Sequence, residues 1–126
     1  MMINKKGGLS MIRRSDEIQD CRIENFKGGN GSIISHPFIA SPDELWGKGR
    51  VFSFMTLEEN CEIGWHVHEG DGEIFCILEG EGEFNDNGTL TTLRSGDVAY
   101  TSPGEGHAFK NLHAEPLRFI ALVLYT

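Results

Sequence analysis

Three side chains that can bind a metal ion lie within one short stretch of the chain. His66 and His68 are separated by one residue, a spacing that on a β-strand places both imidazoles on the same face, about 7 Å apart. A polar loop over residues 69–72 follows, and a four-residue hairpin there would place Glu73 opposite His68. The same register would place Phe75 opposite His66. Two neutral imidazoles and one carboxylate on a common face form the arrangement typical of sites for Fe(II), Mn(II) and similar ions.

The surroundings of these three side chains favour a metal site over a solvated surface. The strands that carry them are at least half buried, because apolar residues flank all three. Ionisable groups that point into a barrel without a partner would cost several kcal/mol, and a metal ion supplies that partner. The flanking apolar residues are Ile63, Val67, Ile74 and Phe75.

The pattern of apolar residues and turn signals predicts short strands along most of the chain. Segments rich in β-branched and aromatic residues are bounded by Gly, Asn and Asp, and Asn87-Gly88 is a strong signal for a hairpin turn. Many short strands separated by turns predict an all-β antiparallel barrel or sandwich. The predicted strands are residues 50–57, 63–68, 73–78, 81–85, 90–94, 97–101, 107–111 and 117–125.

Helical structure is expected in one or two short segments. One begins near Ser15 and a second near Ser41, and serine caps helix N-termini well. In the second segment, Pro42 suits the first helical position, and Glu44 is placed to complete a capping box with Ser41.

The length of the chain suits one domain. Its 126 residues have room for a single core, so we expect a flexible leader over residues 1–14 and one barrel domain over residues 15–126. The codons of Lys6-Gly7-Gly8 can form a bacterial ribosome-binding site shortly before Met11. We therefore expect Met11 to be the true start, which the nucleotide sequence would test.

Charge and composition exclude several classes of partner. Lys and Arg number 11 against 19 Asp and Glu, which gives a net charge of −8. Such a chain repels phosphate backbones and anionic lipids, so we expect neither a nucleic-acid nor a membrane partner. The longest apolar run, residues 119–124, is too short to span a bilayer. Three cysteines without a CxxC spacing favour reduced thiols and a cytoplasmic location.

Two sequence motifs stand out along the chain: the first is His66-x-His68, Glu73 and Gly80, and the second is Gly96-Asp97, Ser102-Pro103-Gly104, His107 and Asn111. These motifs resemble those of the cupin family, in particular its small, single-domain, bacterial-type members with a conserved barrel. Both motifs occur in the family's order, and all four ligand positions are filled. The resemblance implies a jelly-roll β-barrel (a double-stranded β-helix) with the ligands inside it, and it supplies His107 as the fourth ligand.

Four protein ligands would leave about two positions open on a six-coordinate divalent ion, which we expect to be Fe, Mn, Zn or Ni. Open positions are typical of a site that binds or reacts. The inward side of the ligand strands makes Phe75, Ile77 and Phe109 the expected pocket lining. Glu105 is the candidate catalytic proton carrier. Arg50 could anchor a substrate carboxylate, although the sequence does not fix which way its strand faces.

We expect the open positions to chelate a small molecule through two oxygens, such as a 2-oxo acid or a dicarboxylate. Cupins of this size include oxygenases, isomerases and decarboxylases, so the resemblance favours a small metal-dependent enzyme. The alternative is a non-catalytic domain that binds or senses such a molecule. The sequence does not decide between the two.

Two strands predict self-association. Residues 73–78 and 119–124 are apolar on both faces. Because a lone barrel has one interior, the second faces need cover from another subunit. We therefore expect a homodimer.

Overall fold

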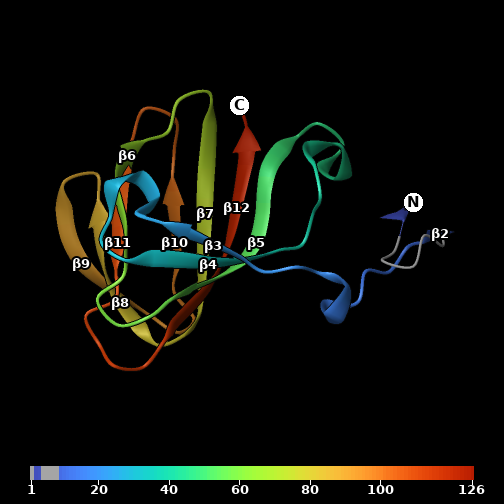
Figure 1. The fold of residues 1–126 in the computed structure, drawn as a ribbon. Coiled ribbons are helices and arrows are strands. Elements are labelled where there is room, and N and C mark those ends of the chain that lie inside the picture. Colours follow the sequence, from blue (N-terminus) through green and yellow to red (C-terminus); the bar gives the residue numbers. More distant parts are fainter. Residues whose placement is uncertain (1, 4–8) are drawn as a thin grey trace.

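Short alternating strands dominate the part of the chain that the computed structural model describes, residues 2–3 and 9–126. Two antiparallel sheets pack face to face in a jelly-roll barrel, which confirms the predicted fold class (Figure 1). The six-stranded sheet contains, in spatial order, β10 (Val98–Thr101), β7 (Asp71–Glu79), β12 (Leu117–Tyr125), β5 (Gly49–Leu57), β4 (Ser32–Pro37) and β3 (Cys21–Glu24). The four-stranded sheet contains β6 (Glu62–Val67), β11 (Gly106–Lys110), β8 (Glu81–Asp86) and β9 (Thr89–Arg94).

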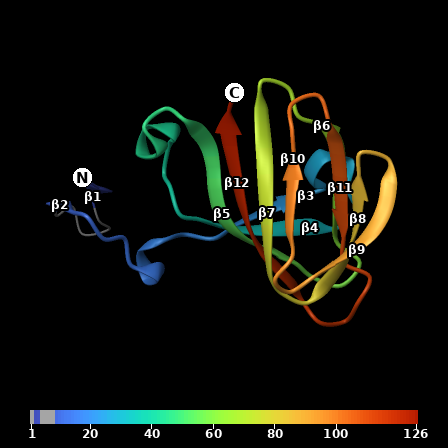
Figure 2. The same cartoon turned by 180° about the vertical axis from the view of Figure 1, so that it is seen from behind.

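The remaining elements are short. β1 (Met2–Ile3) and β2 (Leu9–Ser10) form a small ribbon that lies to one side of the barrel in both views (Figures 1 and 2). Three single 3₁₀ turns complete the described elements, and they fall short of the length that a membrane-spanning helix needs. These turns are η1 (Ser15–Glu17), η2 (Phe26–Gly28) and η3 (Pro42–Leu45).

The expected leader, residues 1–14, lies partly outside the described residues, as does Lys6-Gly7-Gly8. The last residues of this segment contact the barrel domain. The Arg13 guanidinium donates two hydrogen bonds to the Glu44 carboxylate, at 2.9 and 2.7 Å, and a third to the Phe38 carbonyl.

The core forms between the two sheets because strand alternation turns every second residue inward. Along β12, Leu117, Phe119, Ala121 and Val123 are buried, while the residues between them lie on the outer face. From the opposite sheet, Phe109 packs against Phe119 with the ring centroids 5.2 Å apart. One closed, aromatic-rich core therefore supports the open end of the barrel.

The predicted hairpin between β6 and β7 is wrong. β6 pairs with β11, and β7 pairs with β10 and β12, so the two strands belong to different sheets. Glu73 stands opposite Thr101 and Val123, not opposite His68. The short polar loop crosses from one sheet to the other, and local sequence does not distinguish such a crossing from a hairpin turn.

The eight predicted strands all occur, within a few residues of their expected ends. The Asn87-Gly88 turn is confirmed, since Asp86 pairs with Thr89 across it. Strands β3 and β4 were not predicted individually. The expected capping box is also wrong, because Glu44 accepts a hydrogen bond from the backbone N–H of Ala40 and none reaches it from Ser41.

Candidate metal centre

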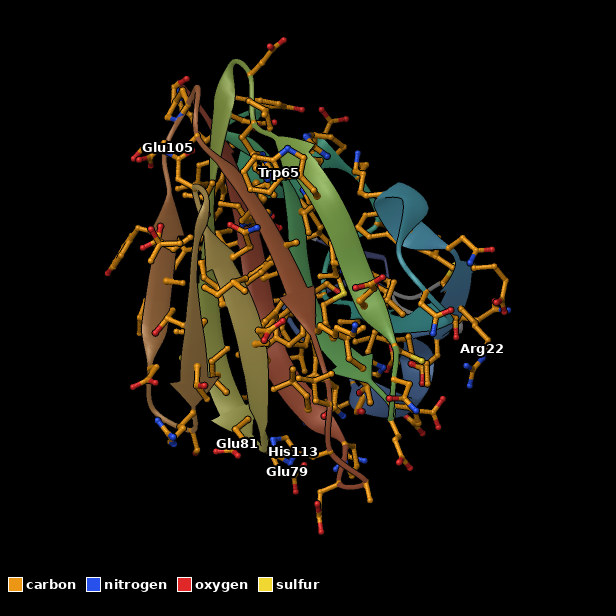
Figure 3. All side chains as sticks on the ribbon, turned by 90° about the vertical axis from the view of Figure 1, so that its left-hand side faces the viewer. Arg22, Trp65, Glu79, Glu81, Glu105 and His113 are labelled. Atoms are coloured by element: carbon orange, nitrogen blue, oxygen red, sulfur yellow. The ribbon has the colours of Figure 1, made fainter. Side chains whose placement is uncertain are left out.

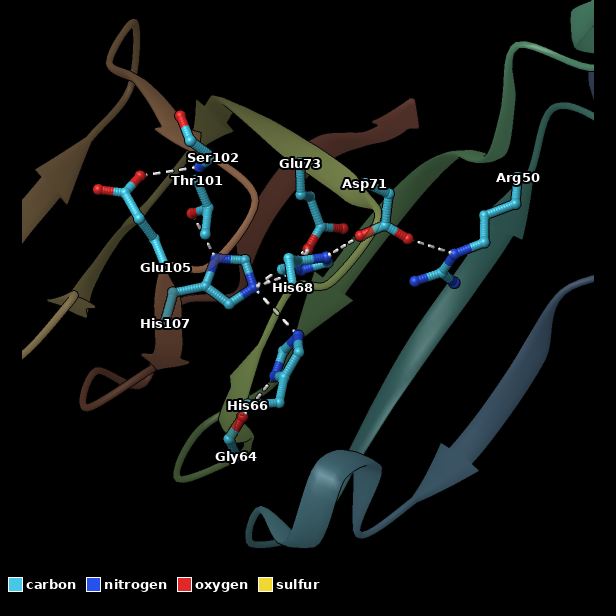
Figure 4. A network of polar contacts seen from close by, with 10 residues as sticks. All are labelled: Arg50, Gly64, His66, His68, Asp71, Glu73, Thr101, Ser102, Glu105 and His107. Carbon is cyan, nitrogen blue, oxygen red and sulfur yellow. Dashed lines mark hydrogen bonds and ion pairs between the residues drawn. The ribbon is translucent and has the colours of Figure 1, made fainter. Parts of the chain in front are cut away.

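Four side chains bring one ligand atom each to a common point at the open end of the barrel (Figure 4). These four residues, called the donor cluster here, are His66, His68, Glu73 and His107, and their ligand atoms all lie within 4.8 Å of one another. The Glu73 Oε1 atom lies 3.0 Å from Nε2 of His68 and 3.1 Å from Nε2 of His107. The Nε2 atoms of His107 and His66 are 3.1 Å apart.

These separations match what a shared ion requires. Two ligands at right angles, each about 2.1 Å from an ion, are about 3 Å apart. Three imidazoles and a carboxylate also form a donor set that first-row divalent ions accept. The residues present therefore fit a single divalent ion, as the sequence predicts.

The donors come from both sheets. His66 lies one residue before the end of β6, opposite His107, its direct partner across the β6–β11 pair. His68 follows immediately after β6, and Glu73 reaches the cluster from β7 in the facing sheet. The predicted convergence of His68 and Glu73 is thus correct, although it arises across the barrel and not across a hairpin.

Each imidazole is oriented by a different hydrogen-bond partner at its second nitrogen. Nδ1 of His66 donates to the Gly64 carbonyl at 2.8 Å, and Nδ1 of His68 donates to the Asp71 carboxylate at 2.7 Å. Because a carbonyl and a carboxylate only accept, Nδ1 carries a proton in both residues, and in the neutral imidazole Nε2 then presents a lone pair to the cluster. For His107, the Thr101 hydroxyl lies 2.8 Å from Nδ1 and can accept from this nitrogen or donate to it.

Electrostatics set the protonation states of the metal-free cluster, and these differ from residue to residue. Burial by itself would raise the pKa of Glu73, but hydrogen bonds with His107 and His68 lower it to about 2. Burial lowers the pKa of His66. The hydrogen bond with Glu73 raises the pKa of His68, against the opposing effect of its burial. An ionised Glu73 and a neutral His66 are competent ligands, whereas His68 holds its proton more strongly and would release it when an ion binds.

A second carboxylate connects the cluster to the cavity wall. Asp71 is buried, and burial would raise its pKa, yet hydrogen bonds from His68 and Arg50 lower it. Nε of Arg50 donates to Asp71 at 2.9 Å, and Asp71 in turn accepts from His68 (Figure 4). Arg50, which the sequence could not orient, therefore faces the site.

A cavity of about 130 Å³ adjoins the cluster, and His66, His68 and Glu73 form part of its wall. At roughly 30 Å³ per water molecule, it has room for about four waters or one small organic ion. Its walls are mostly apolar, and two cationic side chains, Lys27 and Arg50, stand among them. The residues of η2 were not expected there, because they come from a turn far away in the sequence.

Of the three residues expected to line the pocket, Phe75 is part of the cavity wall, and Ile77 and Phe109 are not. Phe75 lines the cavity and stacks on His107, with the ring centroids 5.1 Å apart. Ile77 and Phe109 are each 1% exposed and belong to the core beneath the cavity. Phe75 stacks between His107 and Phe109 and so separates Phe109 from the site. Ile77 shares the inward face but lies deeper along β7.

Glu105 does not line the cavity. Its carboxylate accepts a hydrogen bond from the backbone N–H of Ser102 at 2.8 Å, and Figure 3 shows it at an edge of the molecule. Glu105 was expected to point the same way as His107 because the two residues are two positions apart. That alternation holds only within a strand, and β11 begins at Gly106, so Glu105 belongs to the preceding turn. Nothing in its position supports the expected role as a proton carrier.

The other histidines lie away from the cluster. His113 is exposed, as predicted, and its Nε2 lies 3.0 Å from the Glu81 carboxylate (Figure 3). His36 on β4 contacts Asp20 and does not line the cavity. Trp65, which alternates with the cluster residues along β6, is half exposed on the outside of the barrel (Figure 3).

Comparisons with known proteins agree with this geometry. A family model described as the Cupin domain matches residues 53–124. A Thermotoga maritima protein named oxalate-binding protein is 39% identical over 120 residues, which cover 94% of this chain and 98% of that protein.

Solved structures give the same picture. A Thermotoga maritima crystal structure described as a predicted oxalate decarboxylase has a TM-score of 0.87 and 38% identity, covering 92% of this chain and all of that one. An uncharacterised Klebsiella pneumoniae protein with a double-stranded β-helix domain has a TM-score of 0.67 and 26% identity, covering 93% and 91% of the two chains.

Proposed function

Because the chain belongs to the cupin family, we propose that it binds one divalent metal ion and, through that ion, oxalate or a similarly small dicarboxylate. The observation that carries this proposal is the convergence of the donor cluster beside a cavity of about 130 Å³. His66, His68, Glu73 and His107 would hold the ion, which would be Fe, Mn, Zn or Ni.

The ion would supply a localised positive charge to oxygen donors. Four protein ligands leave about two positions on a six-coordinate ion, which suits a chelating pair of oxygens. The size of the cavity restricts the ligand to a few heavy atoms, and the apolar walls exclude water and strengthen charge interactions inside. Oxalate meets both requirements, and a relative carries its name.

Binding is the function that the cavity supports best. Decarboxylation of oxalate to formate and CO₂ needs a proton delivered to carbon, and among the described residues that line the cavity the only carboxylate is Glu73, itself a proposed ligand. Oxalate decarboxylation is the second candidate, since a structure with 38% identity is described as a predicted decarboxylase. Among the described residues that line the cavity, Lys27 and Arg50 are then the candidate proton donors outside the cluster.

Calorimetry with purified protein tests the proposal. Manganese-loaded protein should bind oxalate with one site per chain, and the metal-free protein should not. If the wild-type protein is fully loaded with metal and does not bind oxalate, the proposal is contradicted. Release of formate and CO₂ from oxalate, measured in the same samples, would replace the binding function with the decarboxylase.

We also propose a cytoplasmic homodimer. The three cysteines are free thiols, in keeping with a reducing compartment. The outer face of the six-stranded sheet is apolar across four strands, which suits a sheet-to-sheet contact between two subunits.

A further inference from the structure

Arg50 is held at the cavity wall by a single, directional contact. Its Nε donates to Oδ2 of Asp71 at 2.9 Å, and Oδ1 of Asp71 accepts from His68 Nδ1 at 2.7 Å. Figure 4 shows these three side chains in a row that ends at the cluster. The guanidinium is therefore oriented from the same carboxylate that orients a proposed metal ligand.

Most of the hydrogen-bonding capacity of this guanidinium is unused. Within the described part of the chain, only Nε makes a hydrogen bond, so the four N–H groups of the two Nη atoms have no protein acceptor. The side chain is 43% exposed and is part of the cavity wall. A free guanidinium fork matches the two oxygens of a carboxylate in geometry and charge.

A purely structural role for Arg50 explains less of this arrangement. Asp71 is buried and needs compensation, but it already accepts a short hydrogen bond from His68. Neutralising Asp71 would not require the Nη groups to remain without a protein acceptor. Lys27 adds a second positive charge to the cavity wall, in a chain whose net charge is −8. The wall thus concentrates positive charge where the rest of the molecule is acidic.

We propose that Arg50 determines specificity for dianions: its Nη groups bind the ligand oxygens that face away from the metal. This inference rests on the proposed function, because it assigns the outer half of the same ligand. Chelation through one oxygen of each carboxylate leaves the other two oxygens of oxalate directed outward, where a cationic fork accepts them. A monoanion of the same size lacks one of these acceptors.

Oxalate and oxamate form the matched ligand pair for the test. Oxamate has the same two-carbon skeleton, but an amide replaces one carboxylate, so it carries one charge less and presents N–H groups where oxalate presents an oxygen. The quantity to measure is the ratio of the two dissociation constants in manganese-loaded protein. We expect Arg50→Gln to reduce the wild-type preference for oxalate by about 10- to 100-fold, the range for hydrogen bonds to charged groups.

Two further variants separate recognition from other effects. Arg118→Gln removes the same charge from an exposed residue that pairs with Glu79 outside the cavity, and it should leave the ratio unchanged. Arg50→Lys keeps the charge beside Asp71 but loses the planar fork, so the preference should fall part of the way. Elemental analysis of every sample shows whether the metal is retained. If Arg50→Gln loses the metal, the ratio of dissociation constants in metal-loaded Arg50→Lys tests the inference instead.

An unchanged ratio in metal-loaded Arg50→Gln, with oxalate still bound, would overturn the inference and leave the proposed function standing. An equal change in Arg118→Gln would overturn it too, since the effect would then be one of overall charge. If the metal-loaded wild type binds no oxalate, both the proposed function and the inference fail.

Discussion

The three histidines of the donor cluster obtain their orientation from three chemically different hydrogen-bond partners. A backbone carbonyl holds His66, a buried carboxylate holds His68, and a hydroxyl lies against His107. A carboxylate acceptor makes an imidazole a stronger ligand than a carbonyl does. The three metal–nitrogen bonds should therefore differ in strength, with the strongest at His68.

Removal of His66 tests the cluster with little disturbance to the core, since this side chain is only partly buried. We expect His66→Ala to lower metal affinity at least 100-fold, because even the loss of an outer partner typically costs 10- to 100-fold. The melting temperature of the metal-free protein should change little. Elemental analysis and thermal unfolding measure the two effects. His113→Ala is the control, and a fully loaded His66→Ala would refute the assignment.

Glu73 should make the stability of the metal-free protein depend on pH. Its pKa is about 2 in the folded protein and 4.5 in a free side chain, so the stabilisation is complete above pH 4.5 and is lost as pH falls toward 2. A shift of this size corresponds to about 3 kcal/mol. Urea unfolding across pH 2 to 6 should show this loss in the wild type and a much flatter profile in Glu73→Gln. The same steep profile in Glu73→Gln would contradict the prediction, and Glu59→Gln, an exposed position, should behave as wild type.

The sequence predicted the cluster residues better than their surroundings, for a physical reason. Residue types and spacing are visible locally, and they were enough to select His66, His68 and Glu73. Which residues line a cavity depends on depth in the barrel and on distant segments. Strand alternation predicts only which way a side chain points. Ile77 points inward but lies in the core below the cavity, and Glu105 belongs to a turn, where alternation does not apply.

At the scale of elements, η2 covers one side of the cavity and is seated on β6 through glycine contacts. A Cβ added to Gly64 would lie 2.1 Å from the Lys27 carbonyl oxygen, and one added to Gly29 would lie 2.3 Å from the Glu62 carbonyl oxygen. The Gly64 carbonyl also accepts the hydrogen bond from His66. One close backbone contact thus positions both the cavity cover and a proposed ligand.

Gly64→Ala should displace η2 from β6. Because the added methyl meets backbone, we expect a loss of about 1 to 3 kcal/mol in unfolding free energy. Amide hydrogen exchange in residues 25–31 should become faster. In Gly72→Ala the nearest atom would lie 3.1 Å from the new Cβ, so exchange in residues 25–31 should stay at its wild-type rate. Unchanged exchange and stability in Gly64→Ala would show that the contact relaxes at no cost.

Strand existence was predictable from the sequence, whereas strand pairing was not. Alternation, β-branched residues and turn signals are local, and they gave all eight predicted strands within a few residues. Whether the polar loop after His68 closes a hairpin or crosses between sheets depends on which distant strands are available as partners. Here β11 pairs with β6, and β12 pairs with β7, so the two strands beside the loop do not pair with each other. These pairings depend on the arrangement of the whole barrel.

At the scale of the whole molecule, the outer face of the six-stranded sheet carries two apolar rows. Each row crosses β5, β12, β7 and β10 in register. Tyr100 is 70% exposed and Val98 is 45% exposed at one end of these rows. A face of this extent suits contact with a second copy of the chain. The rows are Phe52, Leu122, Ile74 and Tyr100, and Phe54, Ile120, Cys76 and Val98.

Tyr100→Glu should convert the proposed dimer into a monomer, because it places a charge at the edge of this face. Light scattering coupled to size-exclusion chromatography at micromolar concentration measures the mass. Leu90→Glu alters an equally apolar residue, 61% exposed on the other sheet, and should remain dimeric. A monomeric wild type would refute the dimer itself.

The donor cluster draws its imidazoles from the four-stranded side and its carboxylate from the facing sheet. An ion held by all four residues would cross-link the two sheets at the open end of the barrel. The sheets could then separate there only after a metal–ligand bond had broken. The lifetime of the folded, loaded protein would follow the dissociation rate of its ion, and a chelator would shorten that lifetime even where it left the equilibrium stability of the core nearly intact.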